Sequence, residues 1–268
     1  MKKVIFNYFI ITAFSVMTVF TSCGGGSFGK IKMTTDSNRN LAFILTGSGA
    51  VTVDWGDGSE KVMQTLNEGR VRFEHTYYPN VGIHTITIKG DNITEFWGGD
   101  IMSLDVSHCT ELTKLEIING QLTNLDISKN SMLKHLWFGN VALTNLDVSK
   151  NTALEVLVSE SQLASLDVSK NIALKVLVCE GQITSLDVSK NTKLEILICN
   201  GQLTNLDISK NTALKLLGFG NQLTVANLHD LFRALHSNMG EKYIRIDSNP
   251  GAFDCNRSIA ERKGWTFQ

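Results

Sequence analysis

A six-residue phrase recurs through most of this chain. Its leucines stand at positions 104, 125, 146, 166, 186 and 206, so consecutive copies lie 21, 21, 20, 20 and 20 residues apart. A fixed period of this length is typical of proteins that stack one repeat on the next. The chain is therefore expected to fold as a solenoid, because a single short unit cannot bury its own apolar residues.

The unit that starts at Leu174 shows which positions the stacking must bury. Six apolar positions recur in the neighbouring units: Leu174, Leu177, Cys179, Ile183, Leu186 and Val188. Regular leucines at this period indicate a leucine-rich repeat. The predicted fold class is mainly β with α structure at the C-terminal cap: a short leucine-rich repeat solenoid of parallel strands with a 20–21-residue period, preceded by a small β-sandwich.

The phrase itself has a structural interpretation. In LDVSKN the Leu and Val alternate with polar residues, which points the apolar pair inward, and SKN forms the bend, where Asn satisfies backbone groups. Stacking then places two charged columns side by side: Asp126, Asp147, Asp167, Asp187 and Asp207, with Lys129, Lys150, Lys170, Lys190 and Lys210. Exposed ion pairs between them contribute only ~0 to 1 kcal/mol each. Calcium binding along the Asp column is an alternative, but no metal site is predicted, because calcium-binding repeats place several oxygens in each turn.

The N-terminal residues are typical of an export signal. Lys2 and Lys3 precede an apolar run that ends at Phe20, and the sequence TSC follows. The run is short for a membrane-spanning helix, so residues 1–22 are predicted to be a signal peptide. Residues 23–29, with the sequence CGGGSFG, are predicted to form a flexible tether.

Two sets of residues resemble a known family. The sequence FTSC, ending at Cys23, resembles the lipobox of bacterial lipoproteins, and LTNLDISKNTAL resembles the repeats of leucine-rich repeat lipoproteins of Gram-negative gut bacteria. The second resemblance covers about residues 91–268. Repeats of that family usually contain the turn sequence NNQL. In this chain NQL is present only at residues 221–223, and the corresponding turns of other units are ESQL, EGQI and NGQL. The resemblance implies a lipid on Cys23 and a surface-exposed protein of the outer membrane that is tethered and does not span it.

Residues 30–90 lack the repeat. Alternating segments surround WGDG, which begins at Trp55, and continue into HTY and HTITI, which predicts strands joined by an Asp57–Gly58 turn. These motifs resemble a PKD-type, immunoglobulin-like β-sandwich, whose family role is that of a spacer or an adhesion module. A catalytic role for Asp54, Asp57 and His75 is the less favoured alternative, because such turns are routine in hairpins.

The solenoid is expected to span 91–225 and a helical cap to span 226–268. Apolar spacing in 227–236 predicts a helix with Asn227 as its N-cap. Residues 243–251 then read as a strand and turn. A second short helix is expected to begin at Asp254 and to stop at Gly264, leaving Trp265 to close the end.

Composition excludes some classes of function. The 268 residues carry a net charge of −1 and are 43% hydrophobic, so no basic surface for nucleic acid is expected. The cysteines at 109, 179, 199 and 255 follow neither a disulfide framework nor a zinc pattern and are interpreted as buried thiols. No nucleophile elbow or phosphate loop is present, so the chain is predicted not to be an enzyme and to need no cofactor.

The strand positions between the leucines indicate where function can lie. They are expected to form the concave face of the solenoid: His135, Trp137, Val156, Val158, Val176, Val178, Ile196, Ile198 and Leu216. A free sheet face should be polar, whereas seven of these residues are adjacent aliphatic side chains that would expose roughly 300 Å² or more. We predict that a protein partner or a second copy covers the face, with His135 and Trp137 as anchors on its rim.

The sequence leaves three alternatives open. The aliphatic residues can simply reflect the preference of β-branched side chains for strands. Trp97 and Trp137 lie in one column and would suit a glycan, which prefers aromatic rings. Glu160 and Glu180 lie one coil apart, a spacing of ~5 Å that a retaining glycoside hydrolase would need.

Overall fold

A computed structural model of the chain describes residues 29–36, 40–77 and 82–268. Cys23 and the predicted signal peptide lie outside the described residues. The elements are β1 (Gly29–Thr35), β2 (Asn40–Asp54), β3 (Val62–Asn67), β4 (Val71–Thr76), β5 (His84–Gly99), β6 (Ser103–Asp105), β7 (Lys114–Ile118), β8 (His135–Gly139), β9 (Val156–Leu163), β10 (Val176–Gly181), β11 (Ile196–Asn200), β12 (Leu216–Gly220), α2 (Val225–Ala234), β13 (Lys242–Arg245), α3 (Ser258–Glu261) and β14 (Trp265–Phe267).

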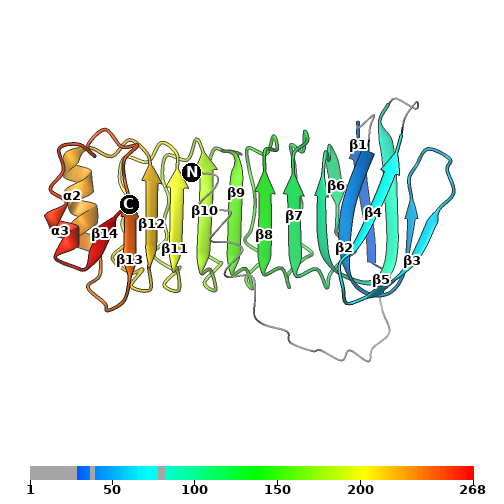
Figure 1. Cartoon of the computed structure of the whole chain (residues 1–268), viewed down its shortest axis with the longest axis horizontal. Helices are drawn as coiled ribbons and strands as arrows, with labels where there is room; N and C mark the ends of the chain where they lie inside the picture. The colour runs from blue at the N-terminus through cyan, green and yellow to red at the C-terminus, as the bar shows by residue number, and fades with distance from the viewer. Residues whose placement is uncertain (1–28, 37–39, 78–81) are drawn as a thin grey trace.

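One sheet runs the length of the molecule (Figure 1); its pairing is antiparallel among the N-terminal strands and parallel from β5 through β7 to β14. The C-terminal part of β5 pairs with β7, and the strands from β7 to β14 continue the parallel pairing in chain order. Between β10 and β11 each residue pairs with the residue 20 positions later, for example Leu177 with Leu197. The predicted fold class, a leucine-rich repeat solenoid with a 20–21-residue period, is confirmed.

The leucines of the strands fill the interior because alternate strand residues face opposite sides of a sheet. Leu157, Leu177, Leu197 and Leu217 are fully buried and belong to one core cluster that extends from Ile31 to Trp265. Most leucines of the repeated phrase are also buried, on the opposite wall of each coil. Stacking thus supplies the burial that no single coil could provide.

The asparagine that ends each phrase has a larger role than the predicted bend. Asn171 is fully buried, and its Nδ2 donates to the carbonyl oxygen of Val148 at 3.0 Å and to that of Asn151 at 2.9 Å. The same pair of bonds to the preceding coil recurs at Asn130, Asn151, Asn191 and Asn211. We call these five residues the asparagine column; it joins successive coils at the bend that leads from each phrase to the next strand.

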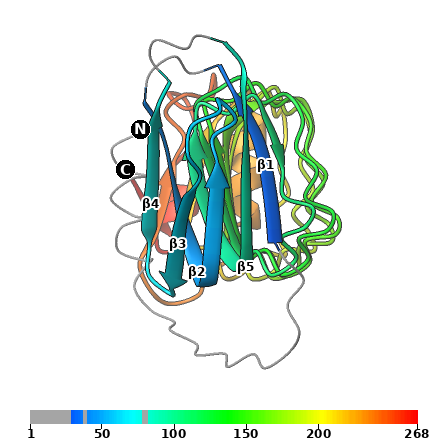
Figure 2. The ribbon, with the colours of Figure 1, turned by 90° about the vertical axis from the view of Figure 1, so that its right-hand side faces the viewer.

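The long strands β2 and β5 lie at the N-terminal end of the molecule, together with β1, β3 and β4 (Figure 2). β2 pairs with β5 over nearly its whole length, and the register shifts at residues 46–51, where Gly47 and Gly49 have positive φ. Beyond this point β5 pairs with β1 instead of β7, and β2 pairs with β3 instead of β4. β5 therefore belongs both to the N-terminal strands and to the solenoid, and it crosses residue 90, where the sequence predicted a domain boundary.

The C-terminal end is closed by two helices and two strands. Leu228, Leu231 and Phe232 of α2 are buried, and Trp265 is 1% exposed, as the sequence predicted. The predicted caps were wrong. Thr224, not Asn227, is the N-cap of α2, and Asn227 occupies the N3 position of a capping box; α3 begins at Ser258 and has no side-chain cap, so Asp254 does not initiate it.

Asp57 and His75 meet in the N-terminal part. The Nε2 atom of His75 lies 2.7 Å from Oδ2 of Asp57, and the His75 ring stacks on Trp55 at 4.8 Å. A hydrogen bond from Ser59, together with that from His75, holds the pKa of Asp57 well below its ordinary value against the opposing effect of burial. The pair ties the turn after β2 to β4, and its side chains are mostly shielded from solvent.

Replacing Asp57 with asparagine is expected to lower the free energy of unfolding at pH 7 by about 2 kcal/mol, since it removes charge-assisted hydrogen bonds. Because the folded pKa of Asp57 is depressed, its contribution is complete above the unfolded-state pKa of about 4 and is lost as the pH falls through the folded pKa. Urea unfolding at pH 7 and pH 3 should show a smaller pH effect in Asp57→Asn than in the wild type. Equal effects would contradict this role, and Asp254→Asn, at an exposed position near the C-terminus, serves as the control.

Candidate functional site: the outer face of the parallel sheet

We call the face of the parallel sheet that turns away from the core the outer face. Its side chains form two rows that cross the strands in register. The first row contains Glu95, Lys114, His135, Val156, Val176, Ile196, Leu216 and Tyr243; the second contains Trp97, Glu116, Trp137, Val158, Val178, Ile198, Gly218 and Arg245. All nine residues predicted for a partner-binding face are therefore brought together on one surface.

The outer face has two chemically different ends. From β9 to β12 these two rows are aliphatic except for Gly218, and the polar residues Glu160, Glu180 and Asn200 follow two positions further along their strands. We call Val156, Val158, Val176, Val178, Ile196, Ile198 and Leu216 the aliphatic strip. From β5 to β8 the same rows hold acidic, basic and aromatic side chains. None of the outward residues Val158, Val178 and Leu216 belongs to the core cluster, although all three are buried.

Exposure varies along the aliphatic strip. Val156, Val176, Ile196 and Ile198 are partly exposed, whereas Val158 and Val178 are each 1% exposed. Val178 has Val158 on one adjacent strand and Ile198 on the other. The centre of the strip is thus more withdrawn from solvent than the sequence predicted, and accessible aliphatic side chains lie on the strands beside it.

Ion pairs border the aliphatic strip. Lys175 Nζ lies 2.6 Å from Glu155 Oε2, and Lys215 Nζ lies 2.7 Å from Glu195 Oε2. Each of these residues directly precedes the first outward residue of its strand. Because the charges alternate and pair with one another, this border offers a partner little net charge, and apolar contact must supply the affinity.

His135 and Trp137 lie on β8, where the aliphatic strip meets the charged end. His135 is exposed and Trp137 is partly exposed. The indole Nε1 of Trp137 is inaccessible and makes no hydrogen bond within the described part of the chain. Trp137 can therefore offer a partner its ring but not its N–H group.

The two glutamates with a possible catalytic role are not held as a regular pair. Cys179 lies opposite Ser159, but Gly181 lies opposite Leu163, so the register between β9 and β10 shifts between these positions. Glu160 pairs with Gly139 of β8, and Glu180 pairs with Asn200 of β11. A glycoside hydrolase mechanism would require Glu160 and Glu180 to lie directly opposite each other on neighbouring strands. Because the register between these strands shifts, the repeat does not place them so.

The aspartates of the repeated phrase form turns instead of pairing mainly with the lysine column. Oδ1 of Asp126 accepts a hydrogen bond from the Ser128 N–H at 2.9 Å, which lowers the pKa of Asp126.

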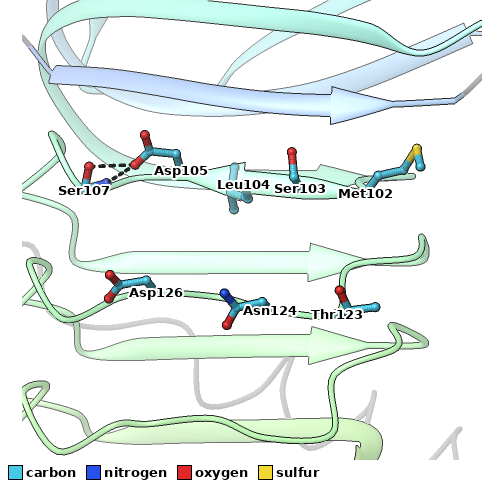
Figure 3. A pocket seen from close by; sticks show the side chains of 8 residues that line it. All are labelled: Met102, Ser103, Leu104, Asp105, Ser107, Thr123, Asn124 and Asp126. Atoms are coloured by element: carbon cyan, nitrogen blue, oxygen red, sulfur yellow. Dashed lines mark hydrogen bonds between the residues drawn. The ribbon is translucent and has the colours of Figure 1, made fainter.

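The first two copies of the phrase, with Asp105 and Asp126, line a groove of about 370 Å³ (Figure 3). Within residues 29–36, 40–77 and 82–268, no three His, Cys, Asp or Glu side chains are grouped to hold a metal ion.

Cys179 and Cys199 stack inside the solenoid. Their strands place them in register, and the Cys179 thiol lies 3.1 Å from the sulfur of Cys199. This contact and burial raise the pKa of Cys179 far above its ordinary value. Cys109 is also a buried thiol, as the sequence predicted, whereas Cys255 is only partly buried.

Two solved structures resemble part of the chain. The functional domain of InlJ from Listeria monocytogenes, which includes a cysteine ladder, is 30% identical over 60% of this chain and 40% of that chain, with a TM-score of 0.49. A leucine-rich repeat protein of Leptospira interrogans is 18% identical over 61% of this chain and 55% of that chain, with a TM-score of 0.42. The chain thus spans about half of their length. No protein-family model and no curated protein matches it.

The described helices are short. None of them is both long enough and apolar enough to cross a membrane.

Proposed function

We propose that the protein is a recognition or adhesion protein of the cell envelope that binds a protein partner through the aliphatic strip of its outer face. One observation carries this proposal: aliphatic side chains of four neighbouring strands stand in register on the face of the sheet that does not contact the core. An open sheet face is ordinarily polar. Apolar residues gathered on such a face favour association with another protein.

Attachment of the chain to the membrane is part of the same proposal. The lipobox-like sequence before Cys23 supports a lipid on that cysteine and a location at the outer membrane. The N-terminal strands, which resemble a PKD-type module in sequence, would then lie between the anchor and the solenoid. Loss of fatty-acid labelling in Cys23→Ala would support the anchor, and labelling that persists would contradict it.

The partner-binding experiment uses a partly exposed residue of the strip. Ile196→Asp places a carboxylate in the first row, and a change of this kind at an interface centre typically weakens binding by about 2 kcal/mol or more, which is about 30-fold. Val178→Asp is less suitable, because the carboxylate would be buried at a site with 1% exposure and would destabilise the fold. Pull-down from surface extracts, followed by titration of the captured protein, measures the effect.

The matched control is Ile172→Asp. Ile172 lies in a bend outside the strands, directly after Asn171, and is 60% exposed, so the same substitution there should leave both folding and binding unchanged. Binding that survives in Ile196→Asp would contradict the proposal. Sedimentation of the wild type distinguishes a second copy of the chain from a different protein as the partner.

A further inference from the structure

The charged end of the outer face contains a pocket that the repeat pattern does not reveal. The pocket has a volume of about 240 Å³ and is lined by Ile44, Thr46, Arg70, Glu95, Phe96, Trp97, Lys114 and Glu116. It lies where the sheet changes from antiparallel to parallel pairing, because β2 borders one edge of β5 and β7 borders the other. Strand pairing arranges six of the lining residues in two rows. One row contains Ile44, Trp97 and Glu116, and the other contains Thr46, Glu95 and Lys114.

Trp97 supplies the apolar surface of the pocket. It is partly exposed in the middle of its row, with Ile44 on one adjacent strand and Glu116 on the other. A flat aromatic ring presented in this way is suited to stack on a flat ligand that has an apolar face.

The polar side chains of the pocket bond to one another, and its acidic and basic residues are equal in number. Lys114 Nζ lies 2.9 Å from Glu116 Oε1, and the Thr46 hydroxyl donates to Glu95 Oε2 at 3.3 Å. Arg70 stands exposed just before β4, and among the lining residues two carboxylates face two cationic side chains. Because these four charges sum to zero, the pocket offers a charged ligand no net attraction, whereas the hydroxyl groups of a neutral ligand could donate to the carboxylates and accept from the cations.

We propose that this pocket binds a neutral sugar ring, with the C–H face of a pyranose on the Trp97 indole. Its hydroxyl groups donate to Glu95 and Glu116 and accept from Lys114 and Arg70. The volume lies below the roughly 300 Å³ at which pockets for drug-sized ligands begin, so one sugar unit of a glycan is held. This site is separate from the aliphatic strip and does not depend on the proposed protein partner.

The experiment uses a printed array of neutral and acidic glycans, followed by calorimetric titration with the methyl glycoside of the best neutral hit. The wild type should bind neutral glycans, Trp97→Ala should bind about 10-fold more weakly or worse, and Trp97→Phe should retain part of the affinity. Trp137→Ala is the matched aromatic control, because Trp137 lies on the same face but does not line the pocket. Thermal unfolding of Trp97→Phe verifies that the fold is intact.

Several results would overturn the assignment: no glycan bound by the wild type, binding only to acidic glycans, unchanged binding in Trp97→Ala, or equal loss in Trp137→Ala. Ile196→Asp separates this site from the proposed partner surface. Glycan binding should survive in Ile196→Asp, and capture of a protein partner should survive in Trp97→Ala.

Discussion

Replacing Asn171 with aspartate is expected to destabilise the solenoid by about 5 kcal/mol at pH 7. The two side chains have nearly the same shape, so no cavity forms. The aspartate cannot donate, and its charge would face the carbonyl oxygens of Val148 and Asn151, to which Asn171 now donates. Both carbonyl oxygens keep a backbone donor, from Asn151 N–H and Leu154 N–H, so the cost comes from the two lost side-chain hydrogen bonds and above all from a buried carboxylate that faces two oxygens.

Chemical denaturation followed by circular dichroism measures this change. Asn205→Asp is the matched control, because Asn205 is exposed and the substitution there should change the unfolding free energy by less than about 0.5 kcal/mol. Asn171→Asp should recover part of its stability at low pH, where a protonated aspartic acid can donate to one carbonyl. Similar stability of the two variants at pH 7 would show that the asparagine column does not join the coils.

Phe43→Ala is expected to cost about 4 kcal/mol and to destabilise the N-terminal strands and the solenoid together. Phe43 is fully buried, and its ring lies 5.3 Å from that of Phe73 and 6.0 Å from that of Phe96. Removing a buried phenylalanine typically costs about 3–5 kcal/mol. Because Phe96 belongs to the part of β5 that pairs with β7, the lost contacts extend into the first coil of the solenoid.

Hydrogen exchange distinguishes a shared unit from two independent domains. In Phe43→Ala, faster exchange is expected both in β2 and in the first coils of the solenoid, β7 and β8. Unchanged protection of β7 and β8 would show that the N-terminal strands unfold alone. Met63→Ala is the control, because Met63 lies on β3 in the same part of the molecule but is 76% exposed.

The repeat period determined most of the solenoid. When each unit has the same length and the same alternation of apolar and polar residues, stacking must bring equivalent residues into register. For this reason the positions of Val156, Val176 and Ile196 in one row could be predicted without a structure. The two terminal segments were predicted less completely: Trp265 closes the end as expected, but the true cap, Thr224, was missed because Asn227 also has a capping side chain.

The candidate site was predicted only where it follows the repeat. The residues of the aliphatic strip recur in consecutive repeat units, whereas the pocket around Trp97 combines β5 and β7 with β2 and with Arg70, and the repeat contains neither β2 nor Arg70. No period relates Arg70 to Lys114, so no pattern in the sequence could place them together. The low exposure of Val178 was missed for a related reason, since exposure depends on everything packed around a side chain and not on its own strand position.

The sequence by itself determined the stack of coils, its parallel sheet and the rows of side chains that cross it, because these follow from one period repeated along the chain. Only the tertiary structure decided which polar residues are buried between coils and where the non-repeating strands join the sheet. Those outcomes depend on contacts between segments that are distant in the chain. The pocket at Trp97 exists because segments of different sequence meet there, and a periodic pattern carries no information about that meeting.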